Sequence, residues 1–298
     1  MAEVLYYAIP FFVLLLIAEY ASFRHLDHDH DDMVGYDLKD TGTSLAMGIG
    51  NVVINVGWKL VVVAVYAALY ELTPLRLEPH NPLTWVLLFF ADDLAYYWFH
   101  RVSHESRVFW ASHVVHHSSQ HFNLSTALRQ TWVPMTYFPF WLPLPLLGFP
   151  VWMVLLAQAW SLIYQFWIHT ERVKRLPKPL EAVLNTPSHH RVHHGMNDQY
   201  LDKNYAGILI IWDRMFGTYE PEGERVKYGL TTQLTTFHPV RVAFHEYIAL
   251  AHDVRAARGL RTKVAVLLHG PGWEPEYPRP HGRVPETPTA AGPERPVG

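Results

Sequence analysis

The sequence predicts an all-α protein, namely a polytopic bundle of about five membrane-spanning or membrane-dipping helices with a cytoplasmic, histidine-rich helical cap. Three observations lead to this prediction. Half of the 298 residues are hydrophobic and only 17% are charged, whereas about 25% is usual for soluble domains. Long apolar runs recur along the chain, and clusters of histidine follow the ends of these runs.

Five apolar runs supply the predicted membrane helices. The first covers residues 4–18, and the second covers residues 44–72. Because about 20 apolar residues cross a bilayer, the second run is long enough to span with a tilt. Its glycines, Gly48, Gly50 and Gly57, permit close approach of neighbouring segments. The other runs cover residues 83–99, 132–149 and 151–168.

The ends of the chain and the fourth run carry further signals. No positive charge precedes the first run and no cleavage site follows it, so a retained membrane helix is expected there. The fourth run is rich in proline and ends at Gly148 and Pro150, which predicts a hairpin with the fifth run that dips into the membrane. Residues 1–269 are expected to form one membrane-embedded domain. Residues 270–298 have few apolar groups and are predicted to be a disordered, proline-rich tail.

Basic residues near the ends of the runs predict the orientation of this integral membrane protein. Seven of them flank the histidine clusters, whereas only Arg76 falls on the opposite side. Five spans then place the N-terminus outside and all the clusters on the cytoplasmic face. The seven are Arg101, Arg107, Arg129, Arg172, Lys174, Arg175 and Lys178.

Nine histidines are predicted to bind metal because of their spacing. His100 and His104 are four residues apart and therefore share a helix face. Two later clusters repeat the spacing i, i+3 and i+4, and His169 ends the fifth run at about the same depth. Since one zinc ion takes about four ligands, nine imidazoles suit two ions. The remaining six are His113, His116, His117, His190, His193 and His194.

Four neighbouring side chains are predicted to contact and orient the metal ligands without binding the metal themselves. They are His189, His121, Asp93 and Glu105, of which Glu105 would orient an imidazole as an outer carboxylate. A surface charge on a helix is the alternative for Glu105, and an ion pair within the bundle is the alternative for Asp93. The histidines of the acidic loop, such as His28, are expected to be solvated.

Composition and missing motifs exclude several functions. The chain has no cysteine, which rules out disulfides, iron–sulfur clusters and thiolate zinc sites. Its net charge is −3 and no basic patch alternates with aromatic residues, so no nucleic-acid partner is expected. A GxGxxG fingerprint for NAD or flavin is also missing. Electrons for redox chemistry would therefore come from a diffusible donor or a partner protein.

Read together, the clusters resemble the fatty acid hydroxylase/sterol desaturase superfamily of membrane di-iron enzymes. Members of that superfamily carry HxxxH, HxxHH and HxxHH around transmembrane segments. This chain has HRVSH at 100–104, HVVHH at 113–117 and HRVHH at 190–194. Further similar strings are NLSTALRQ at 123–130, QFWIHTE at 165–171 and DKNYAG at 202–207. The resemblance extends over residues 37–245.

The resemblance implies that residues 1–269 form a di-iron monooxygenase that uses O2 and tetrahydrobiopterin. The strings are most similar to members that hydroxylate the ether-linked carbon of an alkylglycerol, releasing a fatty aldehyde and a glycerol derivative. The eight cluster histidines carry over as iron ligands, His169 as a further ligand and Glu105 as a required acidic residue. A pterin or head-group pocket is expected to be lined by Asn123, Arg129, Gln130 and Asn204, for which a capping role is the alternative.

Two other functions fit the same residues. A relative that hydroxylates or desaturates a fatty acid, a sterol or a carotenoid would use the same metal ligands. A zinc-binding membrane protein or metal transporter without oxygen chemistry belongs to a different class. A transporter places its ligands near the middle of the membrane, whereas these clusters follow the ends of apolar runs.

Overall fold

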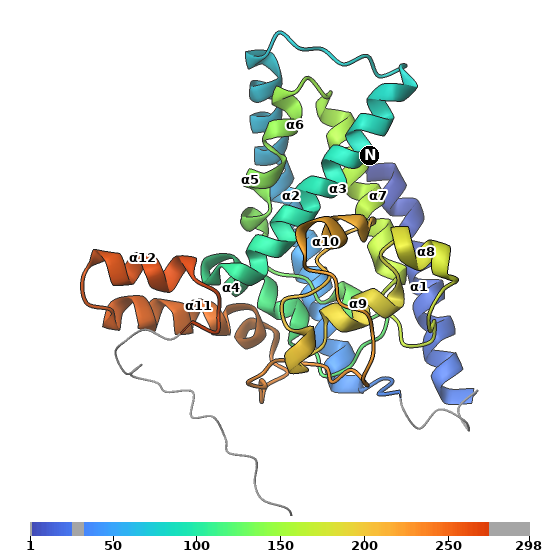
Figure 1. Cartoon of the computed structure of the whole chain (residues 1–298), viewed down its shortest axis with the longest axis vertical. Coiled ribbons are helices and arrows are strands. Elements are labelled where there is room, and N and C mark those ends of the chain that lie inside the picture. The colour runs from blue at the N-terminus through green and yellow to red at the C-terminus, as the bar shows by residue number, and fades with distance from the viewer. Residues whose placement is uncertain (1, 26–32, 274–298) are drawn as a thin grey trace, which may run out of the picture.

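The computed structural model describes residues 2–25 and 33–273, and within these ranges it is helical and contains no strand (Figure 1). The predicted all-α class is therefore confirmed. The acidic loop around His28 and residues 274–298 of the predicted tail lie outside the described residues.

Four long helices form the bundle, and two of them are long and apolar enough to cross a membrane. These two are α1 (Ala2–His25) and α2 (Leu38–Leu72). The third and fifth apolar runs form α3 (Pro82–Glu105) and α7 (Val151–Trp167), of which α7 is a shorter apolar helix. The described residues thus contain two candidate spans, and a total of five stays a prediction.

The C-terminal part of α2 has the surface of a lipid-facing helix. Its apolar side chains Val52, Val56, Leu60 and Leu72 are exposed in the structure. Residues 52–72 rise about 30 Å at about 1.5 Å per residue, which matches the hydrocarbon thickness of a bilayer. The N-terminal part of α2, by contrast, buries Asp40, Thr43 and Ser44 against the rest of the protein.

The fourth apolar run does not form one continuous helix. It is divided into three short pieces, since proline lacks an N–H and interrupts helical hydrogen bonding. The turn predicted before α7 is present, and Gly148 adopts a positive φ of 91° there. Trp141 from this segment packs with Phe149 and Met153 in the largest apolar cluster. The three pieces are η2 (Pro134–Thr136), α5 (Phe138–Trp141) and α6 (Pro143–Leu146).

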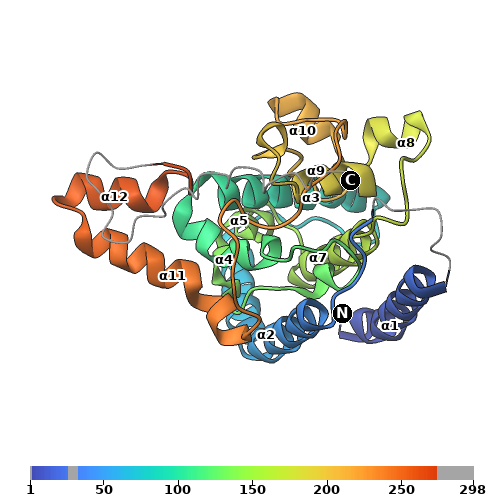
Figure 2. The same cartoon turned by 90° about the horizontal axis from the view of Figure 1, so that it is seen from below.

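The remaining helices lie outside this set of four. Figure 2 shows the last two, α11 and α12, extending sideways from the bundle. The full set of remaining helices is α4 (Arg107–His117), η1 (Thr126–Leu128), α8 (Lys178–Val183), α9 (Pro187–His193), η3 (Asp198–Tyr200), α10 (Ile211–Phe216), α11 (Pro239–Ala256) and α12 (Leu260–Leu268).

Gly50 allows Trp132 to pack directly on α2, and we expect its replacement to destabilise the protein. A Cβ at Gly50 would lie 2.3 Å from Trp132 Nε1, and this indole nitrogen donates to the carbonyl of Met47 at 3.0 Å. Gly50→Ala should lower the free energy of unfolding by about 1–3 kcal/mol, the usual effect of overpacking. The measurement is the melting temperature of the purified protein in detergent.

Gly57→Ala is the matched control for this prediction. Among the described residues, no atom lies within 4 Å of a Cβ built at Gly57. Its replacement should therefore be neutral or slightly stabilising, because alanine has the higher helix propensity. Equal losses for both variants would contradict the packing role of Gly50.

Candidate metal centre

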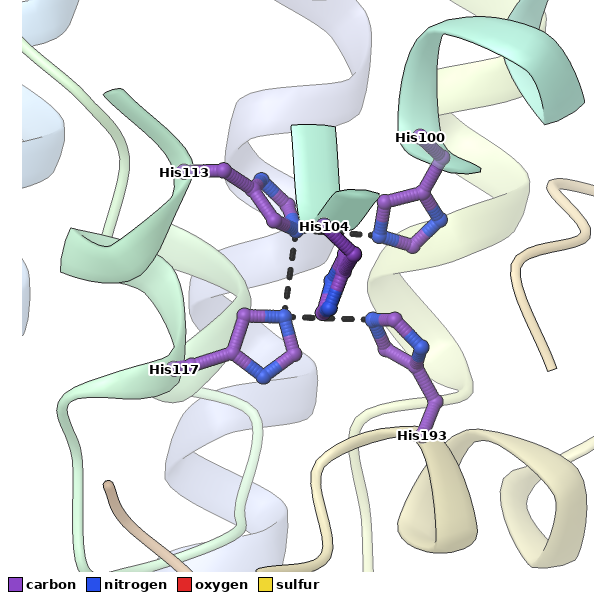
Figure 3. Close-up of side chains that lie close together, drawn as sticks. All are labelled: His100, His104, His113, His117 and His193. Carbon is purple, nitrogen blue, oxygen red and sulfur yellow. Dashed lines mark hydrogen bonds between the residues drawn. The ribbon is translucent and has the colours of Figure 1, made fainter. Parts of the chain in front are cut away.

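The nine predicted histidines converge from four parts of the chain into two groups. Within each group, one ligand atom from every histidine lies within 4.8 Å of the others. The five-histidine site consists of His100, His104, His113, His117 and His193 (Figure 3). The four-histidine site consists of His116, His169, His190 and His194.

The two sites are adjacent because consecutive residues divide between them. His116 and His117 end α4, and each contributes to a different site. His193 and His194 do the same at the end of α9. The rings of His117 and His194 stack with their centroids 4.4 Å apart. Two ions held here would therefore be close neighbours.

Backbone carbonyls fix the tautomers of several of these rings. Nδ1 of His100 donates to the carbonyl of Tyr205 at 2.7 Å, and Nδ1 of His193 donates to that of Lys203 at 3.0 Å. Because a carbonyl oxygen can only accept, each Nδ1 carries the proton. A neutral ring of this tautomer has a lone pair at Nε2, and these Nε2 atoms point into the five-histidine site (Figure 3).

In the four-histidine site, two lone pairs face each other. Nδ1 of His169 donates to the carbonyl of Gln165 at 2.7 Å, and Nδ1 of His116 donates to that of Arg129 at 3.3 Å. The Nε2 atoms of the two rings are nevertheless only 3.1 Å apart. Without a proton or cation between them these lone pairs repel, whereas a metal ion would coordinate both. This geometry fits a bound metal.

The imidazoles are also held in the protonation state that metal binding requires. Burial lowers the pKa of His116 to about 4. Burial, reinforced by the neighbouring imidazoles, places the pKa values of His117, His190 and His194 well below the usual value. All four rings are therefore neutral near pH 7 and offer neutral nitrogens to a metal.

Three buried ring nitrogens of these nine histidines have no hydrogen-bond partner within the described part of the chain. They are Nε2 of His104, Nδ1 of His190 and Nε2 of His194, and all three are buried. A buried polar atom without a partner destabilises by about 1–3 kcal/mol, and metal coordination would satisfy Nε2 of His104 and of His194. Neutral imidazole suits iron, zinc, copper and nickel, so the cluster fits iron.

Two buried aspartates hold the loop that carries Tyr205. Asp213 accepts from the backbone N–H of Tyr205 at 2.7 Å and of Ala206 at 2.9 Å. Asp93 accepts from two further N–H groups of this loop and from Nε1 of Trp212 at 2.9 Å. The described contacts of Asp93 are thus with the loop, which in turn supplies the carbonyl that holds His100.

Tyr205 and Asp213 were not recognised as site residues in the sequence. The ring of Tyr205 lies 5.3 Å from that of His104, centroid to centroid, in addition to its carbonyl contact with His100. The string at 202–207 marked this region as similar to a known family. The string does not indicate that Tyr205 contributes to the site through its backbone carbonyl.

Glu105 reaches the site only through a chain of hydrogen bonds. Its carboxylate accepts from Nε of Arg101 at 2.8 Å, and Arg101 donates to the hydroxyl of Tyr97 at 3.2 Å. Tyr97 contacts Thr218 at 2.9 Å, and Thr218 donates to Asp213 at 2.7 Å. Asp213 in turn holds the loop of Tyr205, whose carbonyl fixes the ring of His100. The direct partner of Glu105 is therefore an arginine and not an imidazole.

His189 and His121 make their described contacts away from the metal-site rings. Nε2 of His189 lies 3.2 Å from a carboxylate oxygen of Glu181. Nδ1 of His121 donates to the carbonyl of Gly35 at 3.2 Å. The backbone carbonyl of His189 accepts from Asn204. Both histidines thus stabilise loops that surround the sites.

The four residues predicted for a pterin or head-group pocket are hydrogen-bonded within the protein. The amides of Asn123, Gln130 and Asn204 donate to backbone carbonyls. The guanidinium of Arg129 pairs with Asp40 at 2.9 Å. Such contacts are those that the capping alternative describes, and a role in cofactor binding stays a prediction.

The arrangement of nine histidines at the ends of apolar helices is typical of a class of membrane-associated metalloproteins. Within that class, residues 85–218 match the model of the family described as fatty acid hydroxylase. This segment contains all nine histidines. The match supports the resemblance of this segment to the fatty acid hydroxylase family.

Three relatives are similar over most of the chain, and each is named alkylglycerol monooxygenase. The human protein is 42% identical over 97% of this chain and 64% of its own length. The Danio rerio protein is 43% identical over 97% and 64%, and the Xenopus tropicalis protein is 44% identical over 87% and 58%. The chain thus spans less than two thirds of the length of each relative. No solved structure matches it.

Proposed function

We propose that the protein is a membrane di-iron monooxygenase that hydroxylates the ether-linked carbon of an alkylglycerol. The observation that carries this proposal is the convergence of nine histidines on two adjacent sites within the segment that matches the fatty acid hydroxylase family. The similarity to alkylglycerol monooxygenases supports the choice of substrate.

Each of the two sites would hold one iron ion. When bound, the irons supply the activation of O2 for insertion into a C–H bond. The chain itself orients the ligands, because the carbonyls of Tyr205, Lys203 and Gln165 fix His100, His193 and His169 in the tautomer that presents Nε2. Burial of the other rings around the half-buried His113 limits the access of bulk water to the reaction.

The chemistry of the substrate fits this site. A C–H bond next to an ether oxygen is weaker than a plain alkyl C–H bond. One oxygen atom enters this bond and the other leaves as water, which takes two electrons and two protons in each turnover. The resulting hemiacetal separates into a fatty aldehyde and a glycerol derivative. Apolar helices would accept the alkyl chain while the head group stays at the interface.

The electrons require an external donor, for which we propose tetrahydrobiopterin. The chain has no cysteine for an iron–sulfur cluster.

We further propose that the site faces the cytoplasm and that Glu105 acts as a positioning residue through Arg101 and Tyr97. Of the seven basic residues that predict the cytoplasmic orientation, Arg107 and Arg129 are buried in ion pairs. The orientation is therefore supported by the other five.

The test is an assay of the purified full chain, loaded with iron, in lipid nanodiscs. With alkylglycerol, O2 and tetrahydrobiopterin, we expect release of a long-chain aldehyde, and no release when O2 or pterin is left out. The same preparation loaded with zinc is the control. Turnover of a sterol or free fatty acid with a ferredoxin or cytochrome donor, and none with alkylglycerol and pterin, would assign the chain to another reaction of the superfamily.

A further inference from the structure

α12 has two apolar faces, of which only one is covered. Val266 is buried and belongs to the cluster that joins α12 to α4 and α11. On another face, Leu260, Val264 and Leu268 are 77%, 41% and 58% exposed. Their spacing of four residues aligns them in one stripe along the helix. Within the described ranges, this stripe faces away from the core.

The charges of the α11–α12 hairpin are sorted by sign. Its two acidic residues, Glu246 and Asp253, are buried and both contact the guanidinium of Arg107, at 2.7 Å and 2.5 Å. The basic residues make no ion pair within the described part of the chain, and Arg258, Arg261 and Lys263 lie beside the apolar stripe. The others are Arg241 and Arg255. The outer surface of the hairpin therefore combines apolar side chains with positive charge.

The hairpin lies at the level where the lipid-facing part of α2 begins. Thr43 of α2 donates to the carbonyl of Phe237 just before α11, and Met47 packs with Val242 in α11. Exposed apolar side chains of α2 become frequent just after these contacts, at Ile49, Val52 and Val53. Figure 1 shows α11 and α12 running across the direction of α2, with α12 on the side nearer to the C-terminal end of α2.

We propose that the α11–α12 hairpin is a second membrane contact, in which the exposed stripe of α12 lies on an anionic lipid surface. A helix in this position buries its apolar side chains at the boundary of head groups and acyl chains. The flanking cations bind the negative head groups. The two observations that support this occupant are the matching charge and the level of the hairpin relative to α2.

A site-specific label can test this contact without any measurement of turnover. The chain contains no cysteine, so Val264→Cys and Leu268→Cys each accept one environment-sensitive fluorophore in the full protein. Gln199→Cys, at an exposed position in η3, is the control. The labelled proteins are placed in nanodiscs of phosphatidylcholine, with or without phosphatidylglycerol. Fluorescence is quenched from water with iodide and from the bilayer with spin-labelled lipid.

We expect the labels at Val264 and Leu268 to be quenched by spin-labelled lipid and protected from iodide, and the label at Gln199 to behave in the opposite way. Phosphatidylglycerol should strengthen the lipid quenching, and Arg258→Glu with Arg261→Glu should remove this gain. Iodide quenching equal to that of Gln199 would overturn the proposal. Protection from iodide without lipid quenching would also overturn it, because another protein segment would then cover the stripe.

Discussion

Replacement of His193 by alanine is expected to abolish turnover and to remove metal from the protein. Nδ1 of His193 is held by the carbonyl of Lys203, and its Nε2 lies 3.1 Å from that of His117 in the five-histidine site. Loss of a group behind a ligand already lowers metal affinity about 10–100-fold, so loss of the ligand itself should exceed this. His116→Ala tests the four-histidine site in the same way.

Metal content per chain and aldehyde release are the two measurements for these variants. His80→Ala is the control, because His80 is exposed in the link between α2 and α3. His28→Ala and His281→Ala, outside the described residues, are also expected to have no effect. A His193→Ala protein with unchanged metal content would remove this histidine from the proposed ligand set. Equal loss in His80→Ala would point to a general effect on folding.

The convergence of the histidines could be predicted because helical spacing alone orients most of them. His100 and His104 share a face of α3, as their separation by four residues requires. Spacing alone does not orient His189, although it is four residues before His193. Its ring turns toward Glu181 near α8, and this partner is set by tertiary packing that the spacing does not contain.

The groups that hold the histidines could not be predicted from residue types. The carbonyls of Tyr205, Lys203 and Gln165 accept from the rings, and every residue has such a carbonyl. The positions of the first two carbonyls depend on how the loop at 203–212 folds back on α3, whereas Gln165 lies in α7. Asp93, far before that loop in the sequence, and Asp213, directly after it, both accept hydrogen bonds from its backbone. Only the folded structure reveals this role.

The start of α2 shows a similar limit. The apolar run predicted a helix over residues 44–72, whereas α2 begins at Leu38 with Asp37 as its N-cap. The additional turn is polar and contains Asp40, which is only 3% exposed. Burial of this carboxylate is possible because Arg129, far away in sequence, neutralises it at 2.9 Å.

Replacement of Asp40 by alanine is therefore expected to destabilise the protein strongly and to disturb the four-histidine site. Arg129 is 1% exposed, and the variant would leave its guanidinium buried without a carboxylate. Removal of one partner from a buried ion pair typically lowers stability by about 3–5 kcal/mol. Because the carbonyl of Arg129 accepts from Nδ1 of His116, the loss should extend to metal binding.

Asp37→Ala separates this effect from a general weakening of the start of α2. Asp37 caps the same turn and accepts from the N–H groups of Lys39 and Asp40, both at 2.9 Å. Loss of an N-cap lowers stability by about 0.5–2 kcal/mol, so its melting temperature should fall less and its metal content should stay unchanged. If Asp37→Ala lowered both quantities as much as Asp40→Ala, the contribution of Asp40 would come from helix capping. A larger loss for Asp40→Ala in both would instead assign it to the buried pair with Arg129, which connects the first turn of α2 to the metal centre.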